Sequence, residues 1–297
     1  MSSLIKAVNT YTFKPSLFLL VFFFSLSGAV LKAQGTSDSS STFTLSWSTK
    51  KLDTGIYWKS YRGDDLFDSR QSINLVELFL DSVSTGFKVA FLEDSMTKTS
   101  EFASNNNALV AVNGSFFDPD TGGSVVFLKV SGKVVHEGHT NRTPFNERGA
   151  IGWSAGQPIQ IIKKPDAGWQ SASFETIMSS GPLLIHNSEV QTFNNDPFHQ
   201  NRHPRTAIAL TNDRRLFLVT IDGRSFQAYG MTIPELTQFL LDLEAKDALN
   251  LDGGGSTSMW IKDMTENGIV NYPSDNLEFD HEGERDVANA LLILSSD

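Results

Sequence analysis

The stretch that decides the fold reads Asp247-Ala-Leu-Asn-Leu-Asp-Gly-Gly-Gly-Ser-Thr-Ser-Met-Trp260. A short apolar run at 248–251 delivers a carboxylate, Asp252, into three glycines and two hydroxyl residues. An apolar run bounded by turn formers is typical of a buried strand. Successive glycines bury no side chain, but they allow positive φ angles and close approach of a ligand to backbone N–H groups. The stretch therefore predicts either a plain turn between strands or a strand end with an acid beside an anion-binding loop.

Two other apolar runs end in the same way. Asn113-Gly114 follows the run at 108–112, and Asp222-Gly223 follows the run at 216–221. An Asn-Gly step is common in tight hairpin turns, which is the alternative for Asn113. If the three strand ends meet at one edge of a sheet, their polar side chains form one site.

Positive charge gathers before a strand in a chain that is acidic overall. Arg202, His203 and Arg205 stand together, and Arg285 directly precedes the final apolar run at 288–294. Arginine forks bind phosphate and carboxylate oxygens in pairs, so these residues suit an anionic ligand, with a surface salt-bridge patch as the alternative. The formal net charge of −10 argues against a nucleic-acid partner or an anionic membrane.

The N-terminal segment is expected to direct export. Lys6 and Lys14 precede an apolar run at 17–26, and small residues lead to Ala33. This pattern predicts a signal peptide over 1–33, because the apolar run is shorter than the roughly 20 residues of a membrane-spanning helix. An uncleaved anchor is the alternative. A polar lead-in at 34–42 and a single domain at 43–297 would follow, without a stable membrane anchor. The chain has no cysteine, so a bacterial periplasm or secretion is the expected location.

The rest of the pattern predicts an α+β fold. Short strand-like runs recur from 43 to 294, and one strong helical pattern covers 232–245. Thr232 and Glu235 form a capping box there, and the apolar face repeats at helical spacing. A shorter helix is expected between 96 and 107. These features predict a single domain with a mixed, largely antiparallel sheet and one long packed helix.

Common catalytic motifs are absent. The sequence contains no GxxxxGK[ST] and no HExxH, and the residues around Ser256 fail the GxSxG pattern at its last position. A divalent cation such as Ca²⁺ or Mg²⁺ would suit Asp118, Asp222 and Asp252 if they shared one coordination shell. The sequence does not place them together.

Seven blocks in order resemble the phosphodiester glycosidase domain family over about residues 85–295. They are Asn113-Gly-Ser-Phe-Phe117, Ser180-Gly-Pro-Leu-Leu184, His203-Pro-Arg-Thr-Ala207, Asp222-Gly-Arg224, Gly230-Met-Thr-Ile-Pro-Glu-Leu236, Asn250-Leu-Asp-Gly-Gly-Gly-Ser-Thr257 and Glu284-Arg285. The resemblance implies that the motif residues line one surface cavity at the strand ends. The first block departs from the family pattern at Ser115, where a second glycine is frequent.

The resemblance implies hydrolysis of a sugar-1-phosphodiester at the anomeric carbon, which releases free sugar and a phosphomonoester. Asp252 is then the catalytic carboxylate, as nucleophile or as base for water, and Asp222 is the second candidate. The expected substrate-binding residues are Asn113, Arg205, Thr206, Gly253, Gly254, Gly255, Ser256, Thr257 and Arg285. The expected partner is a small-molecule or glycan phosphodiester. Two alternatives stay open: a non-catalytic binder of phosphate-containing envelope glycans, and a phosphodiesterase that breaks the P–O bond.

Overall fold

The computed structural model describes residues 45–83, 86–138 and 147–294. The predicted signal peptide at 1–33 and lead-in at 34–42 lie outside these residues. Within them, three antiparallel sheets and short helices build the α+β fold that the sequence predicts. No helix in the described part of the chain is long and apolar enough to cross a membrane.

The largest sheet has eight strands and carries most of the predicted site. Its order is β1 (Ser48–Asp53), β2 (Ile56–Leu66), β3 (Ser69–Phe79), β14 (Arg215–Ile221), β13 (Arg205–Thr211), β15 (Ala245–Asn250), β11 (Leu183–His186) and β12 (Glu189–Val190). Arg205, the first residue of β13, pairs with Ile221, the last residue of β14. Ala207 pairs with Asn250 at the end of β15. The ends of β14 and β15 therefore lie on either side of the start of β13, at the same end of these central strands.

Two smaller sheets complete the strand structure. One has the order β16 (Met259–Ile261), β5 (Ala108–Asn113), β17 (Asn289–Leu294) and β4 (Phe87–Phe91). The other has the order β7 (Lys133–Glu137), β6 (Phe127–Val130), β10 (Thr176–Ser180), β8 (Gly149–Trp153) and β9 (Gln160–Lys163). The predicted antiparallel character is confirmed, but the strands divide among three sheets instead of one. The glycine-rich stretch is the crossing from β15 in the large sheet to β16 in the four-stranded sheet.

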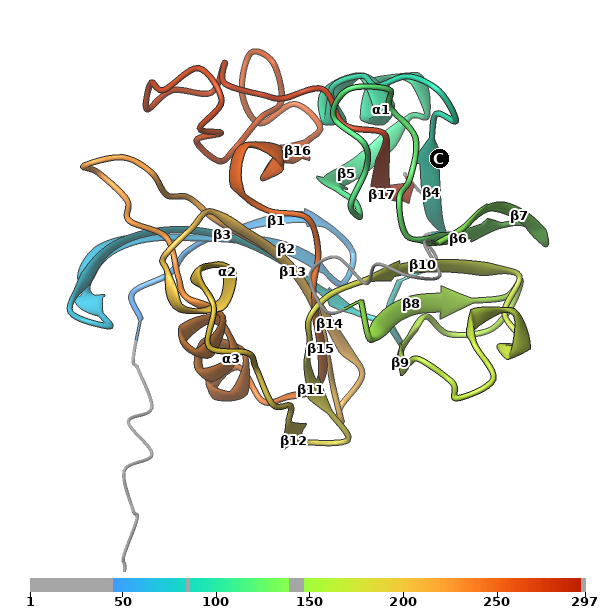
Figure 1. The fold of residues 1–297 in the computed structure, drawn as a ribbon. Coiled ribbons are helices and arrows are strands. Elements are labelled where there is room, and N and C mark those ends of the chain that lie inside the picture. The colour runs from blue at the N-terminus through green and yellow to red at the C-terminus, as the bar shows by residue number, and fades with distance from the viewer. Residues whose placement is uncertain (1–44, 84–85, 139–146, 295–297) are drawn as a thin grey trace, which may run out of the picture. The chain divides into compact units, whose positions relative to one another are not determined.

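The two faces of the large sheet pack against different partners. Ile208 and Leu249 point into a core shared with Val112 and Leu291 of the four-stranded sheet. Ala207 and the neighbouring residues on the other face pack under a helix, because successive side chains of a strand point to opposite faces. Figure 1 shows α2 (Pro197–Gln200) and α3 on one side of the large sheet and the smaller sheets on the other.

Helix α3 (Ile233–Asp242) confirms the predicted helix and its start. The Thr232 hydroxyl accepts from the Glu235 backbone N–H, and the Glu235 carboxylate accepts from the Thr232 N–H, which completes the capping box. The helix ends at Asp242, three residues earlier than predicted, because Glu244 adopts a left-handed φ of 64° and Ala245 opens β15. The shorter predicted helix forms as α1 (Thr99–Asn105).

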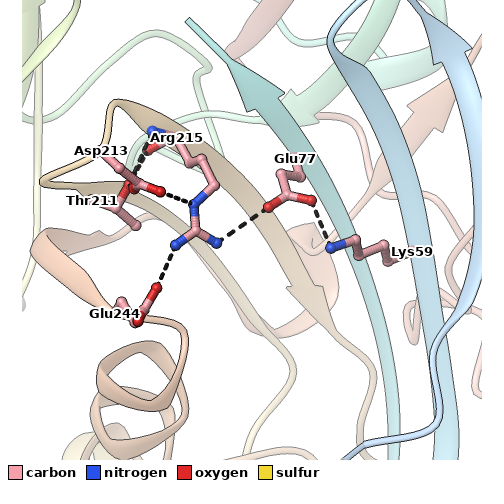
Figure 2. Close-up of polar contacts among 6 residues, drawn as sticks. All are labelled: Lys59, Glu77, Thr211, Asp213, Arg215 and Glu244. Atoms are coloured by element: carbon pink, nitrogen blue, oxygen red, sulfur yellow. Dashed lines mark hydrogen bonds and ion pairs between the residues drawn. The ribbon is translucent and has the colours of Figure 1, made fainter.

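An ionic network crosses one face of the large sheet (Figure 2). Glu77 of β3 is buried and contacts Lys59 of β2 at 2.6 Å and Arg215 of β14 at 3.4 Å. Arg215 also contacts Asp213 at 2.8 Å and Glu244, which follows α3, at 2.5 Å. Because a buried carboxylate without a partner is strongly destabilising, this network ties three strands and the end of α3 together. It lies at the opposite end of β14 from Asp222.

Candidate active site

Asn113 holds the segment that crosses from the eight-stranded sheet to the four-stranded sheet. Its side-chain oxygen accepts hydrogen bonds from the Thr206 hydroxyl at 2.6 Å and the Ser258 N–H at 3.1 Å. Its amide nitrogen donates to the Asp252 carbonyl at 2.7 Å. The Asp252 N–H in turn donates to the Gly114 carbonyl at 3.0 Å. Asn113 and Thr206 are fully buried, so in this structure they position the loop that carries Asp252.

The three glycines leave room for charged neighbours. A Cβ atom on Gly253 would lie 2.8 Å from the Pro204 carbonyl oxygen. On Gly254, whose φ is +63°, it would lie 2.8 Å from Nη2 of Arg224. On Gly255 it would lie 2.6 Å from Nη2 of Arg285. The glycine stretch therefore allows two guanidinium groups to lie directly against the loop.

The backbone amides of the same glycines are largely occupied. The Gly253 N–H donates to the Asp252 carboxylate at 2.9 Å, and the Gly254 N–H donates to the Pro204 carbonyl at 2.9 Å. Among the described residues, the Gly255 N–H has no hydrogen-bond acceptor. The predicted amide cradle is thus open only at Gly255, because the loop tightens into a 3₁₀ turn over Gly254–Ser256. The positive charge available to an anion comes from side chains instead.

Asp252 lies partly exposed within this loop, and burial of its carboxyl group raises the pKa to about 6. The hydrogen bonds from the Ser256 side chain and the Gly253 N–H, together with the charges of Arg285 and Arg224, act in the opposite direction on that pKa. A carboxyl group that changes protonation near neutral pH suits acid–base or nucleophilic chemistry. Thr257, one residue beyond Ser256, has a buried hydroxyl with no hydrogen-bond partner among the described residues.

Two arginines lie near this carboxyl group. Arg224 is exposed and makes no ion pair or hydrogen bond with any described residue. Arg285 is half-buried and pairs with Asp275, whose Oδ1 lies 3.0 Å from its Nε. The charges of both act on Asp252. The Asp222-Gly-Arg motif contained Arg224, but no local pattern in the sequence identified it as a site residue. The fold brings it to the glycines.

Arg205 is buried beneath the site. Its Nε donates to the Met231 carbonyl at 2.9 Å, and its Nη2 donates to the Phe198 carbonyl at 2.7 Å and the Asn201 carbonyl at 3.2 Å. Burial and the charge of Arg224 lower its pKa to about 10. Most of the N–H donors of Arg205 therefore bind carbonyl groups of α2 and of the segment before α3. Its Nη1 makes no hydrogen bond with the described residues and is the one atom left for a ligand.

His203 lies two residues before Arg205 and is half-buried. Burial and the charges of Arg205 and Arg224 lower its pKa. These effects favour the neutral form of the imidazole.

Asp222 is completely buried. Its carboxylate accepts hydrogen bonds from the Ser72 hydroxyl at 2.6 Å, the Tyr272 N–H at 2.8 Å and the Asn271 side chain at 3.1 Å. The Asn271 side chain also donates to the Thr257 carbonyl at 3.1 Å. Burial raises the pKa of Asp222 to about 6. These contacts favour a positioning role for Asp222, beneath the segment that supports the glycine-rich loop.

The described carboxylates do not form a metal shell. Asp118 accepts from the N–H groups of Asp120 at 2.9 Å and Thr121 at 3.2 Å, so it closes its own turn. No group of three His, Cys, Asp or Glu side chains within 45–83, 86–138 and 147–294 is placed to hold a metal ion. The shared shell of Asp118, Asp222 and Asp252 that the sequence allowed is therefore not formed, because each carboxylate is held by a different part of the fold. The expected surface cavity at the strand ends stays a prediction.

The chain matches one known protein family and several known proteins. A family model described as phosphodiester glycosidase matches residues 106–294. The N-acetylglucosamine-1-phosphodiester alpha-N-acetylglucosaminidase of Bos taurus is 27% identical over 190 residues, 60% of this chain and 35% of that protein. The SPbeta prophage-derived uncharacterized protein YomE of Bacillus subtilis is 34% identical over 92 residues, 31% of this chain and 13% of that protein. This chain thus spans about a third or less of the length of these relatives.

Solved structures share the fold. The zebrafish N-acetylglucosamine-1-phosphodiester alpha-N-acetylglucosaminidase catalytic domain, auto-inhibited by its pro-peptide, superposes with a TM-score of 0.66 at 19% identity. That match covers 85% of this chain and 89% of the zebrafish chain. A hypothetical protein from Synechocystis superposes with a TM-score of 0.65 at 17% identity, covering 84% of this chain and 63% of the other.

Proposed function

Because this chain belongs to the phosphodiester glycosidase family, we propose that it hydrolyses a sugar-1-phosphodiester at the anomeric carbon. The products are free sugar and a phosphomonoester. One observation carries the proposal: the Asp252 carboxyl group, whose pKa is raised to about 6, lies in the glycine-rich loop against which Arg224 and Arg285 pack. This combination meets the two needs of the reaction, a cation for the phosphate and a carboxylate for the sugar.

The two arginines stabilise the leaving group. A phosphodiester carries one negative charge, and a second charge develops on the departing oxygen as the C–O bond breaks. Guanidinium groups donate paired hydrogen bonds to such oxygens. Arg224 has no competing carboxylate among the described residues, and Arg285 is held in place by Asp275. A phosphate stabilised in this way leaves without a strong acid to protonate it.

Asp252 acts at the anomeric carbon. In its ionised form it either attacks this carbon, or takes a proton from the water molecule that does so. In both routes the electron pair of the broken C–O bond goes to the phosphate oxygen, and the hydroxyl group on the released sugar comes from water. Asn113, Thr206 and Asp222 contribute by holding the loop, through the hydrogen bonds described above.

The proposed location is outside the cytoplasm of a bacterial cell. The basic and apolar pattern of residues 1–33 supports export. Substrates would then be glycans or small molecules of the cell envelope that carry a sugar linked through a phosphodiester.

The test is a product assay on the purified protein with a panel of sugar-1-phosphodiesters, beginning with an N-acetylglucosamine-1-phosphate methyl diester. We expect free reducing sugar and a phosphomonoester to appear together, and Asp252→Asn to remove both. In ¹⁸O-labelled water the label should enter the sugar. Label in the phosphate would show P–O cleavage. Binding of the panel without any turnover would show that the protein is a glycan binder and would overturn the proposal.

A further inference from the structure

A surface strip of aromatic and arginine side chains begins at the loop that carries Arg224. We define the aromatic strip as Arg62, Arg70, Phe226, Tyr229, Tyr272 and Phe279. Phe226 is 72% exposed and Tyr229 is 41% exposed, which is unusual for large rings in a folded chain. Exposed apolar groups gathered in one place on a soluble protein commonly mark a binding surface. The mechanism proposed above uses none of these six residues.

Arginines lie over the rings of the strip. The Arg70 guanidinium lies 3.9 Å from the centre of the Phe226 ring, and its Nη1 donates to the Phe226 carbonyl at 2.9 Å. The Arg62 guanidinium lies 4.9 Å from the centre of the Phe279 ring. A cation–π contact of this kind restrains a guanidinium and leaves other N–H groups free to donate. Within the described part of the chain, neither Arg62 nor Arg70 makes an ion pair.

The rings at the other end form a stack. The Phe279 and Tyr272 ring centres are 4.0 Å apart with their planes at 10°, and His281 stacks on Tyr272 at 4.6 Å. Such a stack presents a flat platform of fixed orientation, because each ring restrains its neighbour.

Two hollows flank Arg62. One has a volume of about 380 Å³ and is lined by Arg62, Arg70 and Phe226 together with Asp64. The other, of about 390 Å³, is lined by Trp58, Tyr272 and the hydroxyl groups of several serines, and Arg62 borders it as well. Each hollow thus combines an aromatic surface with polar groups that can hydrogen-bond.

The strip is continuous with the candidate active site through the backbone. Phe226 is two residues from Arg224, whose guanidinium lies against Gly254. The Tyr229 N–H donates to the Arg70 carbonyl at 2.9 Å, which joins this loop to β3. Figure 1 shows the loop between β14 and α3 running beside the β2–β3 hairpin. At the other end, the Tyr272 N–H donates to Asp222.

We propose, on the basis of the function proposed above, that the aromatic strip and its two hollows bind the part of the substrate beyond the phosphate, and that this part is a neutral glycan of two or more sugar units. The C–H face of a sugar ring is apolar and packs on an aromatic ring, while its hydroxyl groups need donors and acceptors at the rim. The strip supplies both. A lipid chain would need a continuous apolar groove, whereas both hollows are lined by charged and polar side chains as well as rings. The two arginines, Asp64 and the acidic neighbours of Phe279 give the strip charges of both signs, so it does not select a polyanion.

The test compares two substrates with the same sugar and phosphate, one with a methyl group and one with a trisaccharide beyond the phosphate. In the wild-type protein the trisaccharide diester should have a KM at least tenfold lower than the methyl diester. Phe226→Ala and Arg62→Ala should each reduce this ratio at least threefold, and the double variant should bring it close to one. Val190→Ala and Arg214→Ala are the matched controls, since both residues are exposed and lie outside the strip. These controls should keep the wild-type ratio.

Calorimetric titration with the free trisaccharide separates this inference from the proposed function. Binding by the wild type that the double variant loses, without turnover of either diester, would support the glycan surface and refute the hydrolase. Turnover of both diesters with equal KM would refute the glycan surface and leave the hydrolase standing. The glycan assignment would also be wrong if a diester with a long alkyl chain bound more tightly than the trisaccharide diester and Phe226→Ala removed that difference.

Discussion

Replacing Gly254 with alanine tests what the glycine-rich loop does. Gly254 has φ +63°, and its Cβ would lie 2.8 Å from Nη2 of Arg224. The left-handed conformation costs an alanine about 1–2 kcal/mol. For a domain of this size that lowers Tm by about 2–8 °C. Ordinary contact is about 3.5 Å, so the guanidinium must retreat by about 0.7 Å. Because Arg224 is exposed, this movement should add little to the stability cost.

The effect on activity should be much larger. Displacement of a substrate-positioning group by about 1 Å can reduce rates about a hundredfold. We therefore expect kcat/KM for a sugar-1-phosphodiester to fall about 10- to 100-fold in Gly254→Ala. Gly132→Ala is the matched control, because Gly132 has φ +84° and nothing lies within 4 Å of its added Cβ. It should lose similar stability and less than twofold in kcat/KM.

The assay combines differential scanning calorimetry with initial-rate kinetics on both variants. Equal kcat/KM for Gly254→Ala and Gly132→Ala would refute the argument that the glycine leaves room for Arg224. A far larger loss of Tm in Gly254→Ala would show that the added Cβ meets something rigid, and the activity result would then reflect damage to the fold.

Three other substitutions probe the site and its support. Asp252→Asn should abolish hydrolysis and, at pH 7, raise the free energy of unfolding by at most about 3 kcal/mol, because burial raises the Asp252 pKa from 3.8 to about 6. The folded wild type binds this proton more tightly than the unfolded chain does, so the wild type loses stability as pH rises from about 4 to 6. If urea titrations at pH 4 still give Asp252→Asn a higher free energy of unfolding than the wild type, this account is wrong. Arg224→Ala should raise KM at least tenfold and weaken competitive inhibition by inorganic phosphate, and unchanged inhibition would remove Arg224 from the phosphate site. Glu235→Ala should lower Tm by about 4–8 °C, since it removes the capping box and the Arg202 contacts, worth about 2 kcal/mol together; an unchanged Tm in calorimetry would refute that role.

Local patterns in the sequence determined some elements of this fold. The apolar run before Asp252 and the capping box at Thr232 and Glu235 each act over a few residues, so propensity and periodicity were enough to place β15 and the start of α3. The same patterns could not assign strands to sheets. Pairing partners such as Ala207 and Asn250 are distant along the chain, and no local signal records which strands meet.

The roles of the site residues were decided by tertiary contacts. The sequence identified Asp252 and its glycines, but expected the glycine amides to hold the anion together with Arg205 and Arg285. The fold uses two of those amides internally, buries Arg205 against carbonyl groups, and brings Arg224 to Gly254 instead. Asn113 reaches the Asp252 carbonyl across 139 residues of sequence. Burial and hydrogen-bond partners depend on which distant segments meet, so the sequence determined which groups are present, and the tertiary structure decided which of them face a ligand.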